Sequence, residues 1–551
     1  MTSFRMSVPP PNRPSCTPRR WSIPFTSLTL MIALLIHTSA PHAVLADTLR
    51  IGFAGRVTSL DPHYFVGPAN TSAAMHIFDR LVHRTPGGAL QPWLALSWKA
   101  TADTIWEFHL RPGVHWHDGL EVTADDVAFT IDRVRNVPNS PGGFGGLVRS
   151  IVRTETPDPL TIRVYTNAPA PNLPADLSSL AIISRHTGAS ATTADYNDGR
   201  AMVGCGPYRF MGHINGDTIE LQRNDAWWGP KPAWDRVLIS MLINSATRTA
   251  ALLSGDVDVI EFPNPGDLPR LRADPRISVQ SIEGLQAVFL SPDYSRSEDE
   301  PFVTDHDGRK LPVNPFRDVR VCQALSLAIN RQSLAERVME GAAIATGQWL
   351  PPGVFSYAAN IPVPPQNLPR ARQLLTEAGF PQGFRLTLHT PSDRLPSDSA
   401  TAQAVAQMWA RIGVSTLVEA LPFAIFATRA ARQEFSLRLM TWNSPTAEAG
   451  YMLINVLGSY DPANGRGMVN NGRYANPSLD ALTDRALTTL DDTARERLLI
   501  EAVTKASDDV AMIPLYQVIN FWASRRTVTF EPRRDQRTLA AEMRPIGDNT
   551  Q

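Results

Sequence analysis

The stretch TIWEFHLRPGVHWHDGLEVTADDVAFTIDRV, residues 104–134, decides the fold of this chain. Its first part alternates apolar and polar side chains, with Trp106, Phe108 and Leu110 two positions apart. Because successive side chains of a strand point to opposite faces, these three line one face and the polar residues between them line the other. Pro-Gly and Asp-Gly pairs then interrupt the alternation with turn chemistry. The stretch therefore begins with a half-buried strand that ends in a turn.

The second part of the stretch predicts a helix. Thr123 is suited to cap the first backbone amides, and Asp126, three residues later, is placed to reach back as in a capping box. Val127, Ile131 and Val134 recur at helical spacing and give the helix one apolar face. Further along, helices ending at Gly379 and Gly413 and one beginning at Phe423 alternate with strands at 384–389, 414–420 and 435–440, which is typical of an α/β protein.

Four other segments have distinctive residue patterns that are read together with this stretch. They are IFDRLV at 77–82, QPWLALSW at 91–98, GCGPY at 204–208 and NPFRDVR at 314–320. Together with residues 104–134, in this order and spacing, they resemble the family 5 extracellular solute-binding proteins. These are the dipeptide-, oligopeptide- and nickel-binding components of ABC importers. The resemblance covers nearly all of the chain after the N-terminal region.

The resemblance implies an α/β fold of two lobes, the type II periplasmic binding protein fold, with an extra subdomain on the first lobe. We expect the first lobe at residues 47–285, with the subdomain at about 86–200, and the second lobe at 286–510. The chain then returns to the first lobe at 511–551. A length of 551 residues is more than one ordinary core needs, which agrees with two lobes.

The N-terminal region has the pattern of a signal peptide. Four arginines precede an apolar run at 28–36, and small residues lead to an expected cleavage after Ala46. We therefore expect residues 1–46 to be removed on export to the periplasm. The loss of four Arg from 52 basic residues leaves 48 against 53 acidic ones, a net charge of −5, so no nucleic acid partner is indicated. Cys205 and Cys322 then remain, and we expect both to be reduced and apart.

His115, His117 and Asp118 are the one local cluster with metal-like spacing. Asp118-Gly119 is turn chemistry, so a structural turn is the better interpretation, and we expect no metal and no cofactor. The sequence has no GxSxG, HExxH or GxxxxGK[ST] motif, which favours binding over catalysis. A secreted metal-dependent hydrolase using the two histidines is the alternative from another class.

The segment 439–448, LMTWNSPTAE, is the most informative one for the ligand. Peptide-binding relatives have an aspartate three positions after a tryptophan here, and it pairs with the free amino group of the peptide. This chain has Pro445 at that position after Trp442, so an ordinary free-amino peptide is in question unless Glu448 takes the role. Otherwise Trp442, Asn443 and Ser444 hold a solute without an ammonium by stacking and neutral hydrogen bonds. We favour the second version.

The resemblance supplies further expected substrate-binding residues. The loop 59–62 is expected at the mouth of the binding cleft, and Tyr64 and Phe65 follow it after one residue. Arg473, in a later loop that matches the family, is suited to hold a ligand carboxylate.

The sequence thus predicts a periplasmic binding protein, expected to be monomeric, that performs no reaction. It captures a peptide or peptide-like solute between two lobes and delivers it to an inner-membrane ABC permease. A non-peptide solute such as a nickel chelate, an opine or an oligosaccharide is the alternative within this class.

Overall fold

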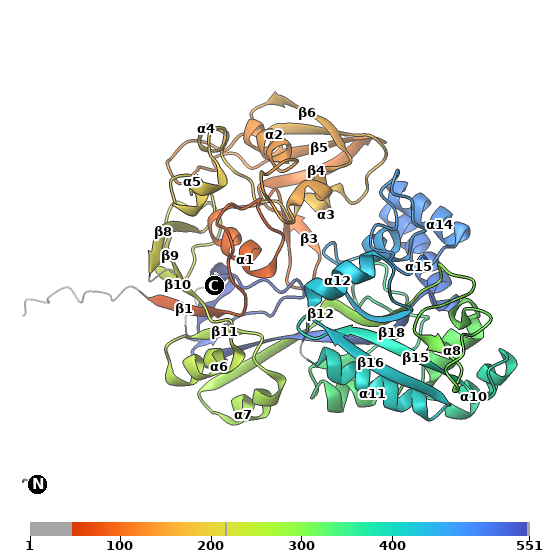
Figure 1. The fold of residues 1–551 in the computed structure, drawn as a ribbon. Helices are drawn as coiled ribbons and strands as arrows, with labels where there is room; N and C mark the ends of the chain where they lie inside the picture. The colour runs from red at the N-terminus through yellow and green to blue at the C-terminus, as the bar shows by residue number, and fades with distance from the viewer. Residues whose placement is uncertain (1–46, 215–216, 396, 548–551) are drawn as a thin grey trace, which may run out of the picture. The chain divides into compact units, whose positions relative to one another are not determined.

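The computed structural model describes residues 47–214, 217–395 and 397–547 (Figure 1). The predicted signal peptide, residues 1–46, lies outside the described residues. Strands and helices alternate along the chain, as the sequence predicts for an α/β protein. The helices are α1 (Pro68–Ile77), α2 (Ala124–Arg133), α3 (Leu173–Leu177), α4 (Arg185–Gly188), α5 (Thr193–Asn197), α6 (Ser245–Ser254), α7 (Leu268–Ala273), α8 (Val319–Ala328), α9 (Arg331–Ser333), α10 (Leu368–Glu377), α11 (Asp398–Ala410), α12 (Phe423–Ala431), α13 (Gly450–Met452), α14 (Pro477–Thr488) and α15 (Asp492–Asp508).

One twelve-stranded sheet runs through most of the described chain. Its strands are, in spatial order, β13 (Val303–Thr304), β15 (Phe384–Pro391), β17 (Leu437–Asn443), β12 (Ile277–Pro292), β18 (Ile513–Arg525), β11 (Val259–Glu261), β1 (Thr48–Phe53), β10 (Arg236–Met241), β9 (Thr218–Arg223) and β8 (Tyr208–Ile214), with β14 (Ala343–Ala345) beside β18 and β16 (Val414–Leu421) beside β15. Parallel pairs join β1 to β10 and β11, and β15 to β16 and β17. The sheet is therefore mixed, as expected when helices supply crossovers between some strands.

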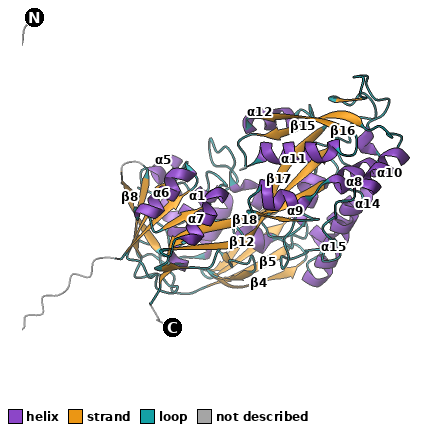
Figure 2. Cartoon of the chain, turned by 90° about the horizontal axis from the view of Figure 1, so that it is seen from below, coloured by secondary structure: helices purple, strands orange, loops and turns teal. Residues whose placement is uncertain are grey.

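The long strands β12 and β18 lie side by side and connect two cores (Figure 1). One core packs β12, β15 and β17 against α8, α10 and α11, and Figure 2 shows these helices beside the β15 and β16 part of the sheet. The other core packs β1, β9 and β10 against α1. The pairing of β12 with β18 shifts register between Glu283 and Ala287. A Cβ on Gly284 would lie 2.8 Å from the carbonyl oxygen of Val518, so only glycine fits this close approach.

The remaining strands form smaller sheets. They are β2 (Val82–Arg84), β3 (Leu90–Pro92), β4 (Ala95–Ala102), β5 (Ile105–Leu110), β6 (Ile151–Asp158), β7 (Thr161–Thr166), β19 (Val528–Thr529) and β20 (Arg544–Pro545). Strands β4, β5, β7 and β6 form a four-stranded sheet with α2 packed on it around a third core. The predicted lobe boundaries at 285 and 511 stay a prediction, because one sheet crosses both positions.

The deciding stretch folds as the sequence predicts. In β5, Trp106, Phe108 and Leu110 are all buried, while the residues between them are half-buried. The backbone amide of Thr123 donates to Asp126 Oδ2 at 2.8 Å at the start of α2. The apolar face of the helix is buried against the four-stranded sheet. Local spacing and capping were sufficient to predict this unit.

The two cysteines lie in different cores and both thiols are free. Cys205 belongs to the core beneath the four-stranded sheet, and Cys322 to the core around α8. Gly204, next to Cys205, is required by packing, since a Cβ there would lie 1.9 Å from the carbonyl oxygen of Ile77. The GCGPY segment is therefore a tightly packed turn against the end of α1.

Candidate functional site

The segment from Trp442 to Tyr451, hereafter the 442–451 segment, leaves the end of β17 and enters α13. The rings of Trp442 and Tyr451 stack with centroids 5.6 Å apart and an interplanar angle of 30°. Trp442 pairs with Ala287 of β12, and the amide of Ser444 donates to the carbonyl of Leu285 at 3.1 Å. Backbone pairing with β12 thus fixes the direction in which the segment leaves the sheet.

Three polar atoms of this segment are buried and have no hydrogen-bond partner among the described residues. They are Trp442 Nε1, Ser444 Oγ and Thr446 Oγ1. Buried donors without partners are costly and uncommon in folded proteins, so each calls for an explanation. Neutral groups of this kind are suited to bind the amides or hydroxyls of a small solute. Asn443, between two of them, is exposed.

Glu448 is buried and already has partners. Its carboxylate forms an ion pair with Arg495 of α15 and accepts from Asn172 Nδ2 at 2.5 Å. Arg495 also donates to Asp492 and to Asn172 Oδ1. An ammonium that paired with Glu448 would have to share the carboxylate with Arg495. The geometry therefore favours the version in which Glu448 does not replace the missing aspartate.

Asp176 of α3 is a second carboxylate at this site, and sequence reasoning missed it. Burial, together with the charge of Glu448, raises the pKa of Asp176 to about 8. Burial and the charge of Asp176 in turn raise the pKa of Tyr451. The described contacts give the Asp176 side chain no hydrogen bond or ion pair, and the charge of Arg84 acts on it in the opposite direction to Glu448. Nothing local in the sequence connects α3 with a segment so far away along the chain, so no pattern could have indicated it.

Arg84 of β2 joins the same site from the other side. Its Nη1 donates to the carbonyl of Thr446 at 3.1 Å and to Gly88 at 2.8 Å, and its Nη2 donates to Ser178 Oγ at 3.2 Å. The 442–451 segment therefore faces residues 84–88 and 172–178, which precede it by hundreds of residues. Two distant parts of the chain thus contact the 442–451 segment, at Thr446 and Glu448.

Tyr64 and Phe65 are held by the Pro- and Gly-rich tract that follows α2. Ser140 Oγ donates to the carbonyl of Tyr64 at 2.6 Å, and Phe65 bridges Gly142. Just before them, Asp61 forms an ion pair with Arg133 at 2.8 Å. Both rings are half-buried. Among the described contacts, none joins them to the 442–451 segment, so their predicted role stays a prediction.

Arg473 lies in a turn with left-handed backbone geometry, at a φ of 54°. Its Nη1 donates to the carbonyl of Asn470 at 2.7 Å, and its guanidinium lies 3.7 Å from the centroid of the Tyr460 ring. Within the described part of the chain it makes no contact with Trp442. Its predicted role in holding a carboxylate stays a prediction.

The two histidines of the metal-like cluster have different surroundings. Both ring nitrogens of His117 contact the backbone of the GCGPY turn, at Gly204 and Gly206, and burial lowers its pKa to about 4. His115 is exposed and its Nδ1 lies 2.9 Å from the carbonyl of Gly113. The described residues contain no group of three or more metal-ligating side chains. The geometry supports the structural interpretation of this turn.

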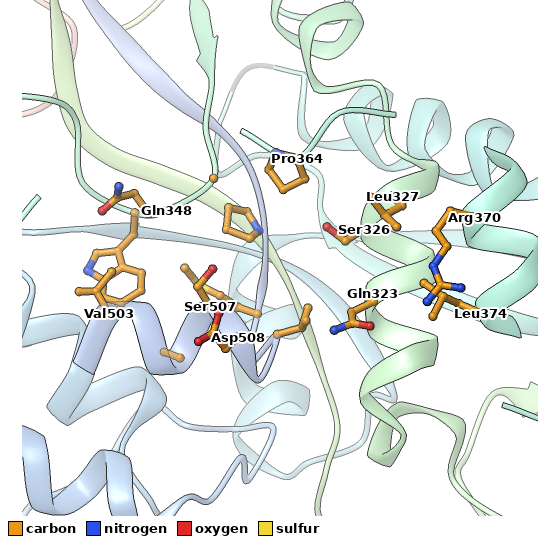
Figure 3. A pocket seen from close by; sticks show the side chains of 16 residues that line it. Gln323, Ser326, Leu327, Gln348, Pro364, Arg370, Leu374, Val503, Ser507 and Asp508 are labelled. Carbon is orange, nitrogen blue, oxygen red and sulfur yellow. The ribbon is translucent and has the colours of Figure 1, made fainter. Parts of the chain in front are cut away.

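A cavity of about 490 Å³ lies elsewhere, between α8, α10 and α15. Figure 3 shows Arg370 and Leu374 on one side of it and Ser507 and Asp508 on the other. Its lining shares no residue with the 442–451 segment. This cavity is therefore separate from the candidate solute site.

A mixed sheet with two long neighbouring strands that connect two cores is the arrangement of the two-lobe periplasmic binding proteins. The structure of HbpA2 from Haemophilus parasuis matches with a TM-score of 0.78 at 24% identity and covers 91% of this chain and 100% of its own. A structure of MoaA from A. tumefacien R10, in complex with mannopinic acid, matches with a TM-score of 0.69 at 26% identity over 91% of this chain and 99% of its own. The predicted α/β two-lobe fold is confirmed.

The family model for bacterial extracellular solute-binding proteins, family 5 Middle, matches residues 89–464. The chain belongs to this family. It is similar to heme-binding protein A of Haemophilus influenzae, with 28% identity over 83% of this chain and 84% of the relative. It is also similar to the dipeptide-binding protein of Escherichia coli, with 27% identity over 76% and 80%. No helix in the described ranges combines the length and apolarity that crossing a bilayer requires.

Proposed function

We propose that this protein captures a peptide-like solute between two lobes in the periplasm and delivers it to an inner-membrane ABC permease. It carries out no reaction on the solute and acts as a monomer. The observation that carries the proposal is the set of unpartnered donors on the 442–451 segment, beside the Trp442 and Tyr451 stack. Stacking and hydrogen bonds to neutral groups suit a solute with amide groups.

We further propose that Asp176 recognises a free amino group on the solute. Asp176 is half-buried and its carboxylate has no hydrogen-bonded partner among the described residues, and the charge of Arg84 only partly offsets the cost of ionising it. An ammonium there would compensate the rest of that cost. Asp176 rather than Glu448 is then the partner of the amino terminus, since Arg495 already neutralises Glu448. This is a third version of ligand recognition, beside the two that the sequence predicts.

The lobe boundaries complete the proposal. Residues 47–285 and 511–551 form the first lobe, with the extra subdomain at about 86–200, and residues 286–510 form the second. The pairing of β18 with both β11 and β12 supports a C-terminal return to the first lobe. Periplasmic binding proteins as a class close by a hinge around their ligand. The register shift beside Gly284 is the expected hinge position.

Export after removal of residues 1–46 is part of the same proposal. N-terminal sequencing of the protein from the periplasm should begin at Asp47. A chain that keeps residues 1–46 would contradict cleavage there. Size-exclusion chromatography with light scattering of the mature protein should give the mass of one chain.

A thermal-shift screen tests the ligand class. Unmodified dipeptides and tripeptides, the same peptides with a blocked amino terminus, opines, sugars and heme are compared on the mature protein. Stabilisation by unmodified peptides that is lost on blocking and lost in Asp176→Asn supports the proposal. The relatives are named for heme and dipeptides, and one structure holds mannopinic acid, so a hit confined to non-peptide solutes would replace the peptide proposal with the alternative.

A further inference from the structure

A second cavity, of about 650 Å³, is lined in part by Thr85, Pro86 and Gly87, next to Gly88, which adjoins the 442–451 segment. Its walls come from the end of α1, the β2 to β3 region, the Trp227 loop and residues 531–544. None of its lining residues belongs to the 442–451 segment or to α3. We call it the Arg80 cavity, after the buried arginine in its wall.

Arg80 is only 5% exposed and makes no side-chain hydrogen bond or ion pair with a described residue. Its Nη2 atom is fully buried without a partner. Burial, together with the nearby Arg537, lowers the pKa of Arg80 to about 9, which still leaves it charged near neutral pH. An unpaired buried charge is costly, so a folded protein rarely keeps one without a use.

The acids near Arg80 are engaged by other residues. Asp79 Oδ1 accepts from Trp93 Nε1 at 2.8 Å, and its Oδ2 accepts from two further indoles, those of Trp227 and Trp228. Arg533 holds both Asp535 and Glu542. Glu531, the remaining acid in the lining, is exposed. Arg80 therefore has no ion pair of its own among the described residues, although the charges of Asp79 and Asp535 act on it, as the charge of Asp535 also does on Arg537.

The rest of the lining is aromatic or apolar. Trp93 and Trp227 are half-buried there, and Trp93 stacks on His83 with ring centroids 4.5 Å apart. Burial and Arg533 lower the pKa of His83 to about 3, so its ring is neutral. Met75 and Leu539 add aliphatic surface. Arg544 also lines the cavity and has no ion pair with a described residue, but it is more exposed than Arg80. A pocket with one buried guanidinium and flat apolar walls suits a planar anion.

We propose that the Arg80 cavity is a second binding site, which takes a small carboxylate with a planar apolar body. The carboxylate pairs with the Arg80 guanidinium, and the ring packs between Trp93 and Trp227. This site has a different lining from the 442–451 segment, although the β2 to β3 turn borders both.

Binding of 4-fluorobenzoate to the full mature protein, followed by fluorine NMR and tryptophan fluorescence, tests the site. We expect saturable binding at millimolar concentrations or below, and weaker binding of benzyl alcohol and of inorganic phosphate. Arg80→Gln should weaken 4-fluorobenzoate binding about tenfold or more, since a charged partner is lost. Arg544→Gln removes an equal charge from the same lining and should leave the affinity within about twofold.

Each contrary result is decisive. Absence of saturable binding, or equal weakening by Arg80→Gln and Arg544→Gln, would overturn the Arg80 site. If benzyl alcohol bound as tightly as 4-fluorobenzoate, the proposed requirement for a carboxylate would be wrong. If phosphate bound as tightly, the proposed requirement for a planar apolar body would be wrong. Arg80→Lys keeps the charge and loses the planar fork, so it replaces Arg80→Gln if that variant does not fold. Peptide binding in the same variants is measured separately, so failure of one site is distinguishable from failure of the other.

Discussion

Glu448 and Arg495 form a buried ion pair, and Glu448 lies in the same short segment as the stacked rings of Trp442 and Tyr451. The pair joins the 442–451 segment to α15, and Asn172 contacts both partners from the other side. A carboxylate so engaged positions its own loop more readily than it receives a ligand's ammonium. We therefore expect specificity at this site to depend on neighbouring residues, such as Asp176, that the sequence alone does not indicate.

Loss of Arg495 should destabilise the protein more than loss of Glu448. Arg495→Gln leaves Glu448 buried with Asn172 alone and should cost about 3–5 kcal/mol. Glu448→Gln should cost about 1–3 kcal/mol, because Arg495 keeps Asp492 at 3.0 Å and the Phe355 ring. Urea unfolding of both variants measures the difference. Equal costs, or a larger cost for Glu448→Gln, would contradict this assignment of partners.

Asp176 should make stability depend on pH in a predictable direction. Its folded pKa of about 8 lies above the ordinary value of 3.8, so the folded state holds a proton that the unfolded state lacks. The contribution of this group is complete below pH 3.8 and is lost as the pH rises toward 8. The melting temperature of Asp176→Asn, measured relative to that of the parent protein, should therefore be higher at pH 8 than at pH 5. A difference in melting temperature that is the same at both pH values would refute the raised pKa.

Trp442 should contribute to binding through both its ring and its Nε1 donor. Trp442→Phe keeps an aromatic ring beside Tyr451 and should weaken solute binding by about 1 kcal/mol, the usual cost of one neutral hydrogen bond. Trp442→Ala loses the stacking as well and should weaken binding by a further ~1 kcal/mol or more. Calorimetry with the solute found in the thermal-shift screen measures both. Full affinity in Trp442→Ala would exclude this segment as the solute site.

Gly204 should tolerate no side chain. Gly204→Ala places a methyl group 1.9 Å from the carbonyl oxygen of Ile77, which is backbone and cannot move aside cheaply. We expect a loss of about 3 kcal/mol or more, or failure to fold. Gly87→Ala is the matched control, since its nearest atom would be 4.0 Å away. Chemical denaturation of the two variants should separate them clearly, and a mild effect of Gly204→Ala would disprove the close contact.

Thiol reactivity should show that Cys205 and Cys322 are unpaired. The mature protein, unfolded without reductant, should titrate two thiols. In the folded protein both should react slowly, because they are buried, and burial raises the pKa of Cys322 to about 12. Finding no free thiols after unfolding would mean that the two cysteines are bridged.

The sequence by itself determined the local units and, through the family resemblance, the class of protein. Trp106, Phe108 and Leu110 predicted their own burial because strand geometry depends on neighbours two residues away. The box of Thr123 and Asp126 predicted the start of α2 for the same local reason. Trp442 and Ser444 were identified as candidate residues because the surrounding segment resembles the family.

The tertiary structure alone decided which charges meet. Asp176, Glu448 and Arg495 come from segments far apart in the chain. Arg80 is likewise far in sequence from Arg533 and the two acids that Arg533 binds, Asp535 and Glu542. Whether such a group is paired depends on the packing of distant elements against each other, and neither periodicity nor spacing records that. Burial then sets the free-energy cost of each charge. A carboxylate or guanidinium removed from water is stabilised only by the partner that packing brings to it.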